Sequence, residues 1–215
     1  MKLRQTIIVM SFGLAPAVSM ADVSANFGMV SDYLYRGIYQ AGSSASAGID
    51  YENDNGLYIG TWGADVADGI ETDVYFGYGG GSGDFSWGIG YTGYYYTDTF
   101  DDTYSEVNLS VGYGMFSLDY AVGEWDGFGS PEDYTFTSLT VEIPNGPYIT
   151  LGSFGDEFDG DYAELGYGFD FMGVDLSVAV VYSDDLNVNA PADDGSRTGD
   201  YQLVFGISKS IAIGE

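Results

Sequence analysis

From about residue 45 onward, apolar side chains occupy alternate positions over segments of about ten residues. This period of two is typical of β-strands, in which successive side chains point to opposite faces. None of the apolar sets contains a charged residue; examples are Tyr58, Trp62, Ala64 and Val66, then Val107, Leu109, Val111 and Tyr113, and later Tyr201, Leu203, Phe205 and Ile207. The sequence therefore predicts an all-β chain whose strands have one apolar face.

The other face of these strands is polar. It carries Gly, Ser and Thr, together with acidic residues in the middle of the strands: Asp50, Glu71, Asp73, Glu106, Asp119, Glu142, Glu164 and Asp175. Two architectures use such strands, because a soluble β-sandwich also has one apolar and one polar face. Periodicity alone does not separate the sandwich from a membrane barrel.

The connections favour the barrel. The expected connections cover residues 37–43, 53–56, 67–69, 79–83, 97–102, 114, 123–133, 144–147, 155–160, 172–173 and 184–199, and short ones alternate with longer ones. Outer-membrane barrels have an even number of antiparallel strands, short turns at one end and longer loops at the other. We therefore predict an antiparallel up-and-down outer-membrane β-barrel of about 12 strands, within a range of 10–14.

Aromatic residues near the expected strand ends support the same architecture. An aromatic girdle meets the lipid headgroups in such barrels. The candidates for this girdle are Tyr33, Tyr35, Tyr94, Tyr95, Tyr96, Tyr182 and Tyr201.

The first 21 residues resemble an export signal. Lys2 and Arg4 precede an uncharged apolar run, and small residues at Ser19 and Ala21 suit a signal peptidase. Residues 1–21 are thus predicted to be a cleaved signal peptide, and residues 22–215 the transmembrane barrel. The expected location is the cell outer membrane.

The composition excludes several functions. The chain has no His and no Cys, so it cannot form a Ser-His-Asp triad, a thiol nucleophile or a Cys/His zinc site. A net charge of -28 argues against nucleic-acid binding, which depends on clustered Lys and Arg. We therefore expect neither an enzyme nor a nucleic-acid partner.

The segment NFGMVSDYLYRGI (residues 26–38), with GIDY (48–51) and GTWGADV (60–66), resembles the TorF-type porin family, which is marked by a Gly-Cys/Thr-Trp signature. The resemblance implies an outer-membrane β-barrel with a pore function and no catalytic residues. One departure concerns the C-terminal aromatic that the assembly machinery commonly reads. Here Ile207 is followed by a tail that ends in Glu215.

The eight acidic residues of the polar face are expected to line the lumen. A ring of carboxylates favours cations and excludes anions. Arg36 is the candidate for an ion pair in the lumen, with Asp32 or an acid of a neighbouring strand. The alternative is a lumen that is closed by its own side chains, as small barrels allow.

The longer connections are rich in acids; a solvated, self-repelling rim is the simpler explanation, and weak binding of Ca²⁺ or Mg²⁺ is the alternative. The candidate ligands are Asp184, Asp185, Asp193 and Asp194. No cofactor beyond such loosely bound ions is expected. Expected partners are outer-membrane lipid and lipopolysaccharide, the assembly machinery and small solutes.

Two functions remain open at this point. The first is a passive channel for small cationic or neutral solutes. The second is a closed barrel that acts as a surface interaction protein through cation-binding acidic loops.

Overall fold

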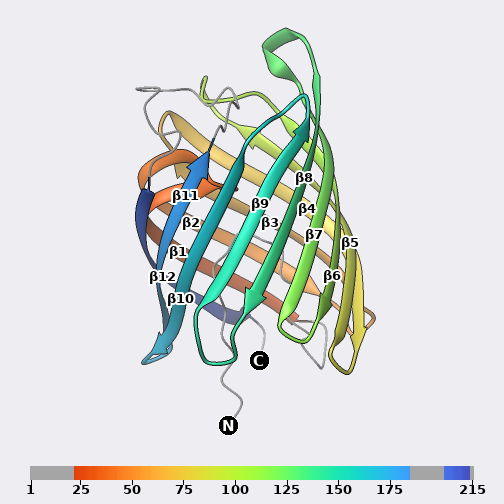
Figure 1. The fold of residues 1–215 in the computed structure, drawn as a ribbon, viewed down its shortest axis with the longest axis vertical. Coiled ribbons are helices and arrows are strands. Elements are labelled where there is room, and N and C mark those ends of the chain that lie inside the picture. The colour runs from red at the N-terminus through yellow and green to blue at the C-terminus, as the bar shows by residue number, and fades with distance from the viewer. Residues whose placement is uncertain (1–21, 185–200, 214–215) are drawn as a thin grey trace.

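The computed structural model describes residues 22–184 and 201–213, which form one closed antiparallel β-barrel (Figure 1). The strands are β1 (Asp22–Tyr35), β2 (Ile38–Glu52), β3 (Leu57–Val66), β4 (Gly69–Ser82), β5 (Phe85–Tyr96), β6 (Tyr104–Tyr113), β7 (Phe116–Trp125), β8 (Glu132–Glu142), β9 (Tyr148–Asp156), β10 (Asp161–Phe171), β11 (Val174–Asp184) and β12 (Tyr201–Ile213). A single 3₁₀ turn, η1 (Gly127–Gly129), interrupts the connection between β7 and β8. The predicted all-β barrel of 12 strands is confirmed.

The barrel closes between its first and last strands. β1 pairs with β12 from Val23↔Ile213 to Val30↔Gly206. The start of β1 and the end of β12 therefore lie together, at what we name the terminal end, and the opposite end is the loop end. β12 continues to Ile213, so residues 208–213 belong to the last strand rather than to a tail.

Most strands present their apolar face outward. Ile70 and Phe76 of β4 are 51% and 52% exposed, and Leu203 and Phe205 of β12 are 52% and 54% exposed. A broad belt of exposed apolar side chains is what a transmembrane barrel presents to lipid. Within the described residues, no helix is long and apolar enough to cross a membrane.

The predicted orientation is wrong for β3. Its exposed apolar residues are Leu57 and Ile59, whereas Ala64 and Val66 are buried and Tyr58 and Trp62 line an internal cavity. Both faces of this strand carry large apolar side chains, so alternation alone could not orient it. The polar partner face that marks the other strands is missing here.

The predicted aromatic girdle is also wrong in part. Tyr95 and Tyr201 are exposed, but Tyr33 and Tyr94 are buried at 5% and 4% exposure. Tyr35 packs edge-to-face on Tyr94 inside the barrel. Tyr33 and Tyr94 donate hydrogen bonds to acidic residues, as described below.

The connections differ from the prediction at two places. The expected loop at 37–43 is replaced by a two-residue turn at Arg36 and Gly37, and the expected turn at 79–83 is mostly part of β4. The loop end carries the longest described connections, 97–103 and 126–131, but it also carries the short turns 36–37 and 67–68. Short and long connections are therefore only partly separated between the two ends of the barrel.

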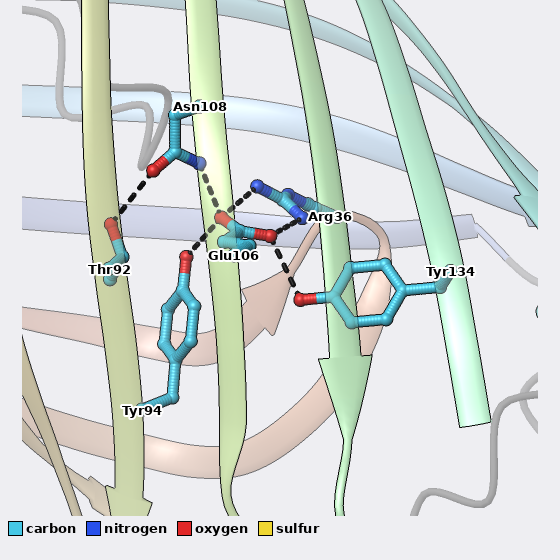
Figure 2. A network of polar contacts seen from close by, with 6 residues as sticks. All are labelled: Arg36, Thr92, Tyr94, Glu106, Asn108 and Tyr134. Carbon is cyan, nitrogen blue, oxygen red and sulfur yellow. Dashed lines mark hydrogen bonds and ion pairs between the residues drawn. The ribbon is translucent and has the colours of Figure 1, made fainter. Parts of the chain in front are cut away.

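The hairpin of β1 and β2 leaves the barrel wall at the loop end. β1 pairs with β12 only as far as Val30, and β2 pairs with β3 only from Ser46 onward. The two strands still pair with each other up to Tyr35↔Ile38, with a register shift next to Leu34. The tip of this hairpin therefore lies inside the barrel, where its contacts define the candidate site (Figures 1 and 2).

Candidate functional site

The tip of the β1–β2 hairpin crosses the lumen to the opposite wall. The Oγ of Ser183 on β11 donates a hydrogen bond to the carbonyl of Gly37 at 2.7 Å. The Arg36 guanidinium lies over the ring of Phe136 on β8, 4.2 Å from its centroid. Ile38 joins the buried apolar cluster that includes Tyr134 and Tyr162. Strands β8, β10 and β11, which lie between two and five strands from β1 around the barrel, thus hold this turn.

A buried ion pair fixes the same turn to β6. Both terminal nitrogens of Arg36 bind the Glu106 carboxylate, at 2.8 and 2.7 Å, in the two-pronged geometry that gives strong, directional pairs (Figure 2). The Glu106 side chain is fully buried and that of Arg36 is 10% exposed. Arg36 therefore pairs neither with Asp32 nor with a neighbouring strand. Its partner lies 70 residues away in the sequence.

Three further side chains satisfy the Glu106 carboxylate. Tyr94 and Tyr134 donate through their hydroxyls at 2.6 and 2.9 Å, and Asn108 donates through Nδ2 at 2.6 Å (Figure 2). Thr92 in turn donates to the Asn108 side-chain oxygen at 3.0 Å. A buried charge is tolerated when it is both paired and fully hydrogen-bonded. The network therefore holds Glu106 ionised and locks the hairpin tip.

The hairpin tip forms one wall of an internal cavity of about 150 Å³. Arg36 and Gly37 line it, together with two of the predicted lumen acids, Asp119 on β7 and Glu164 on β10. Glu164 accepts a hydrogen bond from the Tyr148 hydroxyl. Asp32 of β1 is a third acid in the lining, and the rest includes apolar and hydroxyl side chains such as Val30, Phe136 and Ser138.

The other six predicted lumen acids occupy four settings. Asp50 accepts hydrogen bonds from Tyr75 and Asn26. Glu71 and Asp73 are almost completely buried on β4, and Glu106 is the ion-pair partner. Glu142 is exposed and Asp175 half-buried, each at the terminal end of its strand. Of the eight predicted lumen acids, only Asp119 and Glu164 line the cavity itself.

Only one of the four candidate metal ligands belongs to the described residues. Asp184 is exposed at the end of β11, and Asp185, Asp193 and Asp194 lie outside the described residues. In the described ranges, no group of three or more His, Cys, Asp or Glu side chains is arranged to hold a metal ion.

One loop acid has a structural role. In the 97–103 loop, Asp101 accepts hydrogen bonds from the Tyr104 hydroxyl and the Trp125 indole. Burial raises the pKa of Asp101, and these hydrogen bonds oppose that rise.

The sequence patterns did not predict that Tyr94, Tyr134 and Asn108 bind Glu106. Tyr94 was expected to face the headgroups, and Tyr134 and Asn108 carry no sequence signal of their own. A weak signal did exist, since a chain with 20 Tyr and 33 Asp+Glu offers many phenol donors for carboxylates that have few basic partners.

Two solved structures share this barrel. The chain has a TM-score of 0.58 with the KdgM porin, at 11% identity, over 87% of this chain and 99% of that one. It has a TM-score of 0.63, at 7% identity, with a protein solved in work on the in-meso crystallization of membrane proteins, over 90% of this chain and 85% of the other. At such identities the likeness concerns the fold.

No curated protein matches the chain. A family model described as "Bacterial protein of unknown function (Gcw_chp)" matches residues 14–211. Because the match covers almost the whole described barrel, the chain belongs to the Gcw_chp family.

Proposed function

We propose that this protein is an outer-membrane channel for the passive diffusion of small cationic or neutral solutes. The observation that carries the proposal is the imbalance of charge around the internal cavity. Asp32, Asp119 and Glu164 line it, whereas its one basic residue, Arg36, is already paired with Glu106. Lys209, the other basic residue of the described ranges, is exposed on β12.

Several observations support a location in the outer membrane. The apolar belt suits lipid, and the fold is that of the KdgM porin. The signal-like residues 1–21 and the resemblance to TorF-type porins agree with this location. In this proposal the β1–β2 hairpin is the constriction of the channel, because it crosses the lumen beside the cavity.

A planar bilayer tests the proposal. The chain without residues 1–21 is refolded in detergent, and single-channel conductance and reversal potential are recorded under a KCl gradient. We expect discrete steps and a reversal potential that favours potassium, because fixed carboxylates lower the energy of cations in a narrow lumen. Steps that favour chloride would contradict the proposal.

The hairpin also supports a second candidate, the closed barrel that binds partners through its loops. Arg36, Gly37 and Ile38 fill part of the lumen, and small barrels can be filled completely by side chains. A folded barrel that produces no conductance would favour this candidate. Folding is checked separately by the shift in gel mobility between unheated and heated samples.

A further inference from the structure

Glu71 and Asp73 form a second acidic pair inside the barrel, apart from the Arg36–Glu106 network. They are two residues apart on β4 and share its inward face, which places their Cα atoms roughly 7 Å apart. Their exposed fractions are 1% and 5%. Such burial is unusual for two carboxylates on the same face of one strand.

Hydrogen bonds satisfy this pair only in part. The Tyr33 hydroxyl donates to Glu71 Oε1 at 2.7 Å. By contrast, Glu71 Oε2, Asp73 Oδ1 and the hydroxyl of Tyr35 are buried with no hydrogen-bond partner. Buried polar atoms in folded proteins are almost always satisfied, so three such oxygens in one region of the lumen call for a ligand.

The distribution of charge around Glu71 and Asp73 also favours a bound ligand. The one guanidinium of the lumen is shared with neither acid, because both of its terminal nitrogens bind Glu106. Glu71 and Asp73 are therefore two buried carboxyl groups without a basic partner among the described residues. A carboxylate that is buried without a partner is strongly destabilising.

We propose that a divalent cation binds between Glu71 and Asp73, with Glu71 Oε2, Asp73 Oδ1 and the Tyr35 hydroxyl among its oxygen ligands. Its two charges would balance those of the two acids, and hard cations such as Ca²⁺ take carboxylate and other oxygen ligands, with water completing the shell. The site does not depend on the proposed channel function, since it would be filled equally in a closed barrel. It also differs from the acidic loops, because it lies inside the barrel.

The test is a titration of the refolded barrel, first stripped with a chelator, with CaCl₂ at constant ionic strength. We expect the thermal midpoint to rise by roughly 5 to 10 °C at a Ca²⁺ concentration about 100 times the dissociation constant. In parallel, Tb³⁺ replaces Ca²⁺ and is excited through tyrosine. Tyr33 and Tyr35 belong to the site, so bound Tb³⁺ should luminesce and Ca²⁺ should quench this signal by competition.

Matched variants locate the ion. Glu71→Gln and Asp73→Asn keep the shape of the side chains, and each should abolish most of the Ca²⁺-dependent rise and of the Tb³⁺ signal. Asp119→Asn, in the lumen cavity, and Asp126→Asn, in the 126–131 loop, should preserve both. If a variant fails to fold, the Tb³⁺ signal of the wild type still shows whether a tyrosine-lined site exists.

Two outcomes would overturn the proposal. The first is a Ca²⁺ effect that survives in Glu71→Gln and Asp73→Asn but falls in Asp126→Asn, because the ion would then bind the loops. The second is a wild-type barrel that does not respond to Ca²⁺ or Tb³⁺ and is stabilised by Glu71→Gln or Asp73→Asn. In that case a bound proton, not a cation, neutralises the pair.

Discussion

Inside this barrel, tyrosine rings lie across glycines of neighbouring strands. A Cβ added to Gly123 would come 2.4 Å from Tyr134 Cζ, and one added to Gly166 would come 2.2 Å from Tyr148 Cζ. The same contact joins Gly60 to Tyr75 and Gly152 to Tyr162. The flat rings cover the exposed backbone, and their hydroxyls reach acids such as Asp50, Glu106 and Glu164. These pairs therefore account for part of the abundance of Gly and Tyr.

Gly152→Ala tests this contact. The new Cβ would lie 2.2 Å from Tyr162 Cε1 and 3.0 Å from Phe136 Cζ. Both rings are buried and stacked on each other, so neither has room to move. We expect a loss of about 1–3 kcal/mol in the free energy of unfolding, measured by urea denaturation in lipid vesicles. The control is Gly168→Ala, where the nearest atom is the Leu176 carbonyl oxygen at 3.6 Å. Equal losses in the two variants would contradict the argument.

The Arg36–Glu106 pair gives a second prediction at this scale. Arg36→Met should lower the free energy of unfolding by about 3–5 kcal/mol, because it leaves the Glu106 carboxylate buried without its cation. The double variant Arg36→Met/Glu106→Gln should be more stable than Arg36→Met, since it removes the stranded charge. The same urea experiment measures both variants. A double variant no more stable than the single one would mean that the pair carries little electrostatic coupling.

At the scale of elements, the alternation of apolar residues was enough to predict the strands. It did not predict the orientation of a strand that has large apolar side chains on both faces. β4, β6 and β12 show the expected outward face because their other face is polar. The orientation predicted for β3 was wrong because both of its faces carry large hydrophobic side chains, Tyr58 and Trp62 on one and Leu57 and Ile59 on the other. Similarly, nothing near Arg36 indicates that the turn folds inward. The cause is non-local, in Glu106, Phe136 and Ser183 on other strands.

The inward hairpin should limit conductance, and Gly37→Ala tests this. Gly37 has a φ of +83°, which disfavours any residue with a Cβ. That Cβ would also lie 2.6 Å from Tyr162 Cβ, an atom close to the backbone that cannot swing away. We expect the hairpin tip to lose its contact with Tyr162 and move, and the single-channel conductance to rise because the lumen widens.

The control for this variant is Gly42→Ala on the same hairpin. There the nearest atom is the Tyr39 hydroxyl at 3.0 Å, at the far end of a long side chain. Both variants must keep the gel mobility of a folded barrel. Unchanged conductance in Gly37→Ala would show that the tip does not narrow the conducting path.

At the scale of the whole molecule, the count of charges predicts an acidic lumen but does not predict the role of each acid. The sequence predicts eight lumen acids, and the structure divides them into an ion-pair partner, a buried pair, hydrogen-bonded residues and exposed residues at the terminal end. This division depends on which side chains meet across the barrel. Asp119 and Glu164 are the two that face the cavity, so selectivity should depend on them.

The double variant Asp119→Asn/Glu164→Gln should therefore lose most of the preference for potassium over chloride, measured as the reversal potential under a KCl gradient. The control Asp98→Asn/Asp126→Asn removes the same number of charges from exposed loops and should keep the preference. The dependence on salt concentration tests whether fixed charges produce the selectivity. The Debye length falls from about 30 Å at 0.01 M to about 3 Å at 1 M, so fixed lumen charges should select cations more strongly in dilute salt. Screening weakens loop and lumen charges alike, so only the variants locate the selecting charges. Equal selectivity in the two double variants would contradict the role of Asp119 and Glu164.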